Sequence, residues 1–350
     1  MRSIAPSAEI NSEPLDMGQL VSACFPPTTS NLFLMKAFPY LYAAEYEHPF
    51  DRQALDRLEN TRGIRLVSKK VLDHGLEKYL LMRHTGDNLQ ITPQTIPELY
   101  MALEKACELL AMKALPELFL FLDDKIKSFT IGESRQVIAI SSGAVELLNE
   151  EEMLFFLGRE LGHIRSNHVL YHMMATSIRA VSQLIGEMSL GIGNLLSMPL
   201  RMALLHWHRM SEFTADRAGL LTCQNPEVAM STLIKISGLP ARYYGRVSSA
   251  EFRRQARAFD DIQESHFDKF IRFAAKHESD QPFTIIRASQ LFQWIEAGDY
   301  ERILEKDRLE GMPPDFHCTN RNCPFPFEEE ESYCRECGME LSRLRQPAQG

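Results

Sequence analysis

The sequence predicts an α+β protein that is mostly helical, with a small antiparallel sheet and a small cysteine-rich module at its C-terminal end. Apolar residues recur at helical spacing through most of the segment from 97 to 296. Three short strand-like runs between 117 and 141 interrupt that pattern. Four of the seven cysteines lie in the last 35 residues. We therefore divide the chain into an N-terminal extension (1–60), a main domain (61–310) and the cysteine-rich module (311–350).

The bulk composition is that of an ordinary globular protein, with 45% hydrophobic and 24% charged residues. The net charge of -9 gives no support to nucleic-acid binding, which usually needs a basic patch. The first residues lack the apolar core of a secretory signal. Clustered cysteines suit metal binding in a reducing compartment better than a disulfide framework. We expect a cytoplasmic protein and not a secreted one, and the sequence leaves membrane association open.

One uncharged apolar stretch runs from Met188 to Leu200. It is too short to span a bilayer, which requires about 20 residues. It predicts a buried core helix; an interfacial helix or re-entrant loop is the alternative. A peripheral membrane contact through about 169–207 therefore stays open.

The first third of the chain predicts short elements. Residues 1–60 are interrupted by prolines and predict an extension with short helices. Gly63–Val67 and Lys78–Met82 have the composition of short strands. A helix is expected to begin at Pro97, because proline suits the first helical turn.

The middle of the chain predicts three strands followed by a helix. The strands are expected at Glu117–Leu122, Ser128–Ile131 and Gln136–Ser141, with turn residues between them. Asn149 and Glu152 form a capping box for the following helix, which continues through residue 164. Further helices are expected at 206–221, 226–236, 250–259, 267–275 and 287–296.

The helix after the capping box carries an incomplete zinc-protease motif. In the pattern H-E-x-x-H, two histidines four residues apart hold the metal and the glutamate acts as general base. Here Glu160 and His163 are present, but the first histidine is replaced by Arg159. An arginine has only hydrogen-bond donors and cannot ligate a cation.

A second pair of acidic residues could complete such a site. Glu212 and Asp216 lie four residues apart on a later predicted helix and therefore share one face. A catalytic zinc takes three protein ligands and one water, so a glutamate on a following helix can be the third ligand. A carboxylate one turn further on can orient a ligand from behind.

These features together resemble the HtpX-like family of zinc metallopeptidases, which is related to the membrane CAAX prenyl proteases. The resemblance covers roughly residues 60–305. It includes the three strands, the segment Glu212-Phe-Thr-Ala-Asp-Arg-Ala-Gly219, Gly162-His163-Ile164, Ser166-x-His168 and the arginine of Pro282–Arg287.

The resemblance implies a gluzincin-type fold and a zinc-dependent metalloendopeptidase acting on peptide or protein substrates. Glu160 would activate zinc-bound water, His163 and Glu212 would be zinc ligands, and Asp216 would orient a ligand. The strand containing Ser128, Phe129 and Thr130 would pair with the substrate as an added strand.

Two positions depart from the family pattern. Gln281 stands where the family often has histidine, and Arg159 stands at the first ligand. Two unit charges about 4 Å apart repel by about 4 kcal/mol at an effective dielectric of about 20, so a guanidinium facing Zn²⁺ costs roughly twice that. The alternative function is therefore an impaired pseudopeptidase that binds extended peptides or partner proteins.

We hypothesise that Arg159 replaces the zinc electrostatically by forming a bidentate pair with Glu212 or Asp216. Zinc binding could still be rescued in two ways. Arg159 could turn outward, or another histidine could supply the missing ligand. The candidates are His168, His172, His206 and His208.

The C-terminal cysteines form two pairs, which predict a zinc ribbon of four thiolates around one Zn²⁺. The ligands are Cys318, Cys323, Cys334 and Cys337. Glu328 to Glu331 lie between the pairs and disfavour phosphate binding. A role in protein docking or in stability is favoured instead.

Overall fold

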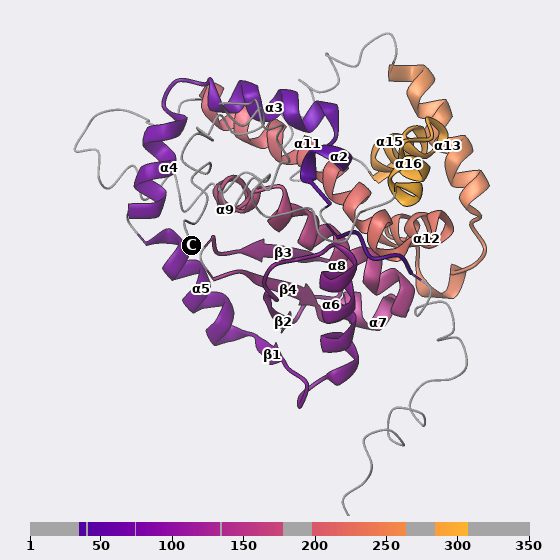
Figure 1. Ribbon diagram of the computed structural model, residues 1–350, viewed down its shortest axis with the longest axis horizontal. Coiled ribbons are helices and arrows are strands. Elements are labelled where there is room, and N and C mark those ends of the chain that lie inside the picture. Colours follow the sequence, from indigo (N-terminus) through magenta and orange to yellow (C-terminus); the bar gives the residue numbers. More distant parts are fainter. Residues whose placement is uncertain are drawn as a thin grey trace, which may run out of the picture. The chain divides into compact units, whose positions relative to one another are not determined.

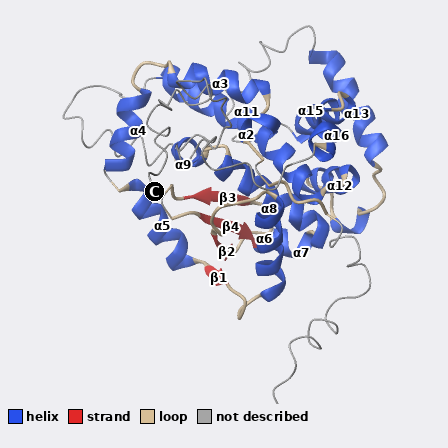
Figure 2. Cartoon of the chain, in the orientation of Figure 1, coloured by secondary structure: helices blue, strands red, loops and turns tan. Residues whose placement is uncertain are grey.

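The computed structural model describes residues 35–177, 198–263 and 284–306, apart from 40, 74 and 134. The chain divides into two compact units, 1–36 and 37–350, and every element below belongs to the second. Helices predominate over strands in this unit (Figures 1 and 2). The helices are α2 Ala43–Tyr46, α3 Pro49–Glu59, α4 Ile64–Asp73, α5 Leu76–Asp87, α6 Pro97–Leu109, α7 Ser142–Leu147, α8 Glu150–Arg165, α9 Val169–Thr176, α11 Met198–Cys223, α12 Pro226–Ile236, the 3₁₀ helix η2 Ala241–Tyr243, α13 Ser249–Gln263, α15 Thr284–Glu296 and α16 Asp299–Glu305.

The sheet is mixed rather than antiparallel, which corrects the sequence prediction. Its strands are β1 Leu89–Ile91, β2 Glu117–Phe121, β3 Ser128–Ile131 and β4 Val137–Ser141, in the order β1-β2-β4-β3. The outer pairs are antiparallel, but β2 and β4 run parallel. Every residue of β4 is buried, and such a continuous apolar strand belongs in the middle of a sheet. It therefore separates β2 from β3, and β3 becomes an edge strand.

Two predicted strands are wrong. The segments Gly63–Val67 and Lys78–Met82 lie in or beside helices α4 and α5. In α4 the buried apolar residues are Ile64, Val67 and Val71, which have helical spacing. A five-residue window is too short to reveal that period.

Other expectations are confirmed. Helix α6 begins at Pro97, and the three strands between 117 and 141 are present. The capping box forms in full: Glu152 N donates to Asn149 Oδ1, and Asn149 N donates to Glu152 Oε2, each at 2.9 Å. Helix α11 is longer than predicted.

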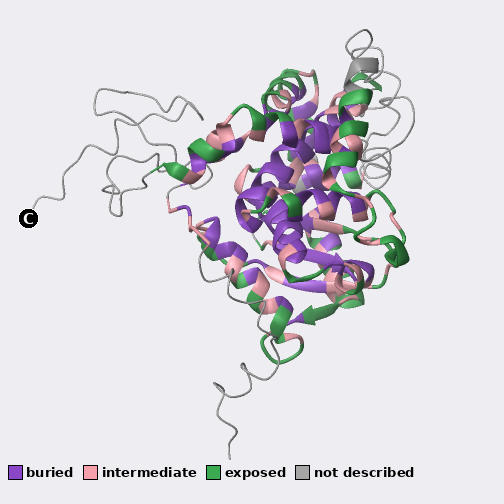
Figure 3. Cartoon of the chain, turned by 90° about the vertical axis from the view of Figure 1, so that its right-hand side faces the viewer, coloured by how far each residue is buried: buried purple, intermediate pink, exposed green. Residues whose placement is uncertain are grey.

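The central feature of the fold is a close crossing of α8 and α11, both largely buried (Figure 3). Small residues permit this approach. A Cβ atom added to Gly162 would lie 2.5 Å from the Cβ atom of Ala218, and one added to Gly219 would lie 2.7 Å from the carbonyl oxygen of Phe155. The two helices thus place their polar residues opposite one another.

Some predictions fall outside the described residues. These are the four cysteines of the ribbon, the helix at 267–275 and most of the apolar stretch from 188 to 200. The three-part division of the chain stays a prediction. Within the described residues, no helix is both long and apolar enough to cross a membrane.

Candidate active site

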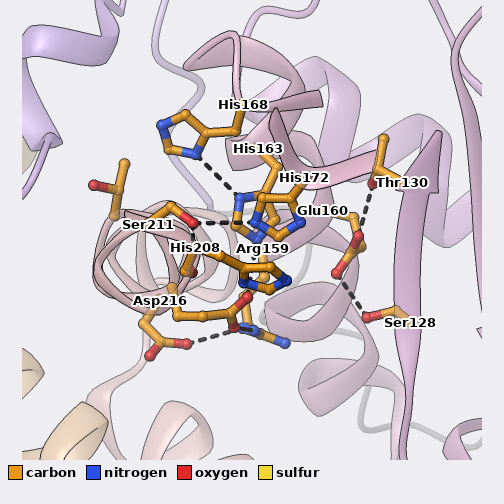
Figure 4. Close-up of polar contacts among 12 residues, drawn as sticks. Ser128, Thr130, Arg159, Glu160, His163, His168, His172, His208, Ser211 and Asp216 are labelled. Carbon is orange, nitrogen blue, oxygen red and sulfur yellow. Dashed lines mark hydrogen bonds and ion pairs between the residues drawn. The ribbon is translucent and has the colours of Figure 1, made fainter. Parts of the chain in front are cut away.

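The crossing of α8 and α11 brings the predicted motif residues together. Arg159 and His163 project from α8, and Glu212 and Asp216 project from α11. None of the four side chains is more than 4% exposed. Figure 4 shows Arg159, His163 and Asp216 grouped together, with Ser128 and Thr130 of β3 to one side.

Arg159 points into this cluster and pairs with both acids. Its Nε donates to Asp216 Oδ1 at 2.8 Å, and its Nη2 donates to Glu212 Oε2. Arg159 therefore pairs with these acids as expected, but the predicted bidentate pair with a single acid is wrong, because one nitrogen bonds to each. An outward rotation of Arg159 is not what the structure shows.

A second arginine completes the charge network. Arg287 on α15 donates from Nε to Asp216 Oδ2 at 2.8 Å and from Nη2 to Asp216 Oδ1 at 2.5 Å. Its Nη1 lies 3.9 Å from Glu212 Oε2. Burial alone would raise the pKa of Glu212, but Arg159, His163 and Arg287 outweigh burial and hold that pKa well below its usual range. Glu212 is therefore an anion at neutral pH.

Glu160, the expected general base, is held against the edge strand. Ser128 Oγ donates to Glu160 Oε1 at 2.6 Å, and Thr130 Oγ1 donates to Glu160 Oε2 at 2.7 Å. Ser128 and Thr130 lie two residues apart, so their side chains share one face of β3. Each carboxylate oxygen accepts one hydroxyl proton and keeps a further lone pair, so these bonds hold Glu160 in place without preventing it from accepting a proton from water.

Three histidines gather on the other side of the cluster. His163 Nε2 lies 3.5 Å from Glu212 Oε1, and His163 Nδ1 lies 3.1 Å from His168 Nδ1. His172 of α9 lies beside His163, with ring centroids 4.0 Å apart. Among the described residues, His163, His172 and Glu212 each offer one possible ligand atom, and these atoms all lie within 4.8 Å of one another. Of the four proposed replacement ligands, His172 is the one in this group.

Two residues near the histidines had no sequence signal. His168 Nε2 lies 3.2 Å from Asp51 Oδ2, and Thr214 Oγ1 donates to the same oxygen at 2.5 Å. Burial raises the pKa of Asp51, but His168 and Thr214 outweigh it and hold that pKa below its usual range. Asp51 lies on α3, more than a hundred residues from the motif, so no local pattern could have linked them.

Comparison with known proteins now places the chain. A family model described as peptidase family M48 matches residues 93–293, more than half of the chain. The chain belongs to peptidase family M48. This is a family of zinc-dependent metallopeptidases, hydrolases that cut peptide bonds.

Individual relatives of this M48 protein are distant. The plastoglobule-localized metallopeptidase 48, chloroplastic, of Arabidopsis thaliana is 27% identical over 77% of each chain. A protease HtpX homolog of Streptococcus pneumoniae is 26% identical over 29% of this chain and 34% of its own length. Another, from Desulforapulum autotrophicum, is 25% identical over 42% of this chain and 55% of its own length. No solved structure matches the chain.

The zinc that the family implies does not fit its usual position here. Two ligands from the motif helix and a glutamate from a later helix are needed. The first place is filled by the Arg159 guanidinium, which also engages Glu212. A buried cation bonded to a ligand opposes a second cation at that point.

Proposed function

We propose that this M48 protein binds extended polypeptide segments along β3 and does not hydrolyse them by the family's zinc mechanism. The observation that carries this proposal is the buried Arg159 guanidinium bonded to Glu212 and Asp216. It removes a ligand and adds a repulsion of roughly 8 kcal/mol at about 4 Å, before screening by the neighbouring acids. Unfolded or extended protein segments are the expected partners. A net charge of -9 gives no support to nucleic acid as the partner.

The binding part of the proposal is supported by the edge position of β3. Ser141 N donates to the carbonyl oxygen of Lys127 at 2.9 Å, so that residue pairs inward with β4. Because backbone groups alternate along an antiparallel strand, those of Ser128 and Thr130 point to the free edge. An extended peptide can pair with them as a further strand.

The side chains of β3 support the same use. Ser128 and Thr130 hold Glu160 on one face of the strand. Phe129 projects to the opposite face, where its ring lies 4.5 Å from that of His84 and 5.2 Å from that of Phe121. A paired peptide would thus meet a polar face and an aromatic face on alternate residues.

Peptide-bond hydrolysis is the second candidate function, and the retention of Glu160, His163 and Glu212 favours it. These residues match the general base and two of the three zinc ligands of the family pattern. Hydrolysis would require a replacement for the ligand lost at Arg159.

Fluorescein-labelled casein, an unfolded polypeptide, tests both functions on the full chain. We expect saturable binding, measured by fluorescence anisotropy, without release of acid-soluble fluorescence. Replacing Ser128 with proline removes both its hydroxyl and its backbone N–H at the free edge. Replacing it with alanine removes the hydroxyl but keeps the N–H, so the two variants differ in that backbone donor.

The proline variant is expected to bind about 5- to 10-fold more weakly than the alanine variant, in line with the loss of one backbone hydrogen bond. Equal affinity of the two variants would reject pairing at β3. Zinc-dependent release of acid-soluble fluorescence would reject the non-hydrolytic part and favour the second candidate.

A further inference from the structure

We propose that His163, His172 and Glu212 form a divalent-cation site that joins helices α8, α9 and α11. The site differs from the family's set by one ligand, with His172 in place of the residue at 159. It does not depend on peptide binding at β3, but an occupied site would supply the replacement ligand that the second candidate function requires. Zinc bound without casein hydrolysis would leave the proposed function standing, and casein binding without this zinc would leave it standing while the present inference fails.

The distances suit a metal of the size of zinc. Zinc binds imidazole nitrogen and carboxylate oxygen at about 2.0–2.2 Å, so two ligand atoms of a tetrahedral site lie about 3.3–3.5 Å apart. His163 Nε2 and Glu212 Oε1 are 3.5 Å apart. The ligand atom of His172 lies within 4.8 Å of both. A shift of about 1 Å by one imidazole ring completes the three-ligand arrangement.

The contacts behind His163 fix the orientation of its ring. His163 Nδ1 lies 3.1 Å from His168 Nδ1, and the carboxylate of Asp51 faces His168 Nε2 at 3.2 Å. The other ring nitrogen, His163 Nε2, faces Glu212 Oε1 at 3.5 Å. A cation between these two atoms would meet one nitrogen and one oxygen donor.

Zn²⁺ is the cation that these donors favour. Two imidazoles and one carboxylate are common zinc ligands, whereas Mg²⁺ and Ca²⁺ prefer oxygen alone. Arg159 bonds to Oε2 of Glu212, which leaves Oε1 for the metal. The cation would hold three helices together, and the Glu212 carboxylate would lie between it and the Arg159 guanidinium.

Zinc per chain, measured by elemental mass spectrometry on the full protein, tests the site. The parent is compared with His172→Gln and with His206→Gln, a matched change on α11 outside the cluster. We expect His172→Gln to lose about one zinc per chain and His206→Gln to lose none. Counting the difference removes any contribution from the C-terminal cysteines. Equal zinc in a folded His172→Gln variant and the parent would overturn the proposal.

Cobalt loading of the unaltered parent gives a second test that needs no variant. Co²⁺ bound by thiolates absorbs strongly in the near ultraviolet, whereas Co²⁺ bound by nitrogen and oxygen gives only weaker visible bands. The proposal expects an equivalent of cobalt that adds visible bands without the thiolate absorption. Cobalt uptake that shows the thiolate signature throughout, or no uptake, would contradict it.

Discussion

Replacing Arg159 with methionine should strongly destabilise the protein at neutral pH, because it leaves Glu212 buried without its main cation. Removing one partner of a buried ion pair costs about 3–5 kcal/mol. Asp216 keeps its paired bonds from Arg287, but the same arginine lies 3.9 Å from Glu212 and compensates it only in part. We therefore expect the lower end of that range, about 3 kcal/mol.

The loss should shrink in acid. In the parent, Arg159 and its neighbours hold the pKa of Glu212 well below the ordinary value of 4.5. Because the pKa of Glu212 is lower in the folded protein than in the unfolded one, its ionisation stabilises the fold at a pH above the unfolded-state pKa. This stability is lost as the pH falls through the folded-state pKa. In the variant, burial raises the pKa of Glu212. As the pH is lowered, this carboxyl group is therefore protonated at a higher pH in the variant than in the parent, and its unpaired charge is removed. The difference in stability between the two proteins should narrow as pH falls from 7 toward 4.

Urea unfolding of the parent and Arg159→Met, at equal metal content and several pH values, measures both effects. Arg135→Met is the control, because its ion pair with Glu117 is exposed and should matter much less. Glu212→Gln, alone and combined with Arg159→Met, completes a double-mutant cycle. A penalty for Arg159→Met no larger than that of the control, or one independent of pH, would refute the account of Arg159 as the counter-ion of Glu212.

Three further changes, one of them with a matched control, test the rest of the account. Arg159→His restores the motif and should produce zinc-dependent casein hydrolysis; an inert variant would indicate that the site has decayed beyond this residue. Gly162→Ala should lower the urea-unfolding free energy by about 1–2 kcal/mol, because overpacking outweighs the gain in helix propensity. Gly86→Ala, where an added Cβ meets nothing within 4 Å, should raise it by about 0.5–1 kcal/mol. Thr214→Val removes the hydroxyl bonded to Asp51 and should cost about 1.5–3 kcal/mol at pH 7, less in acid, since Asp51 has a lowered pKa.

Local patterns in the sequence predicted the elements that carry the motif. Proline at the start of α6 and the Asn149–Glu152 box depend on residues within one turn. The pairing of Arg159 with the acids of α11 was also predictable. Glu212 and Asp216 are four residues apart and therefore lie on one face of their helix, where a single arginine can reach both. These predictions needed only local spacing and opposite charge.

The rest of the site depends on tertiary contacts that no short window contains. The parallel pairing of β2 with β4 follows from which strand is buried on both sides. Asp51 reaches the site because α3 packs against α11. The hydroxyls of Ser128 and Thr130 did leave a signal, since two hydroxyl residues at period two share one face of a strand.

The position of Arg159 explains why so much of the metallopeptidase motif can persist without the family's zinc. If the metal were lost and nothing replaced its charge, Glu212 and Asp216 would face each other as buried anions, at a cost of several kcal/mol. Arg159 bonds to both acids, and Arg287 doubly engages Asp216. The Arg159 guanidinium bonds only to Oε2 of Glu212, so Oε1 still faces His163 Nε2 at 3.5 Å, and a displaced cation can bind between those two atoms.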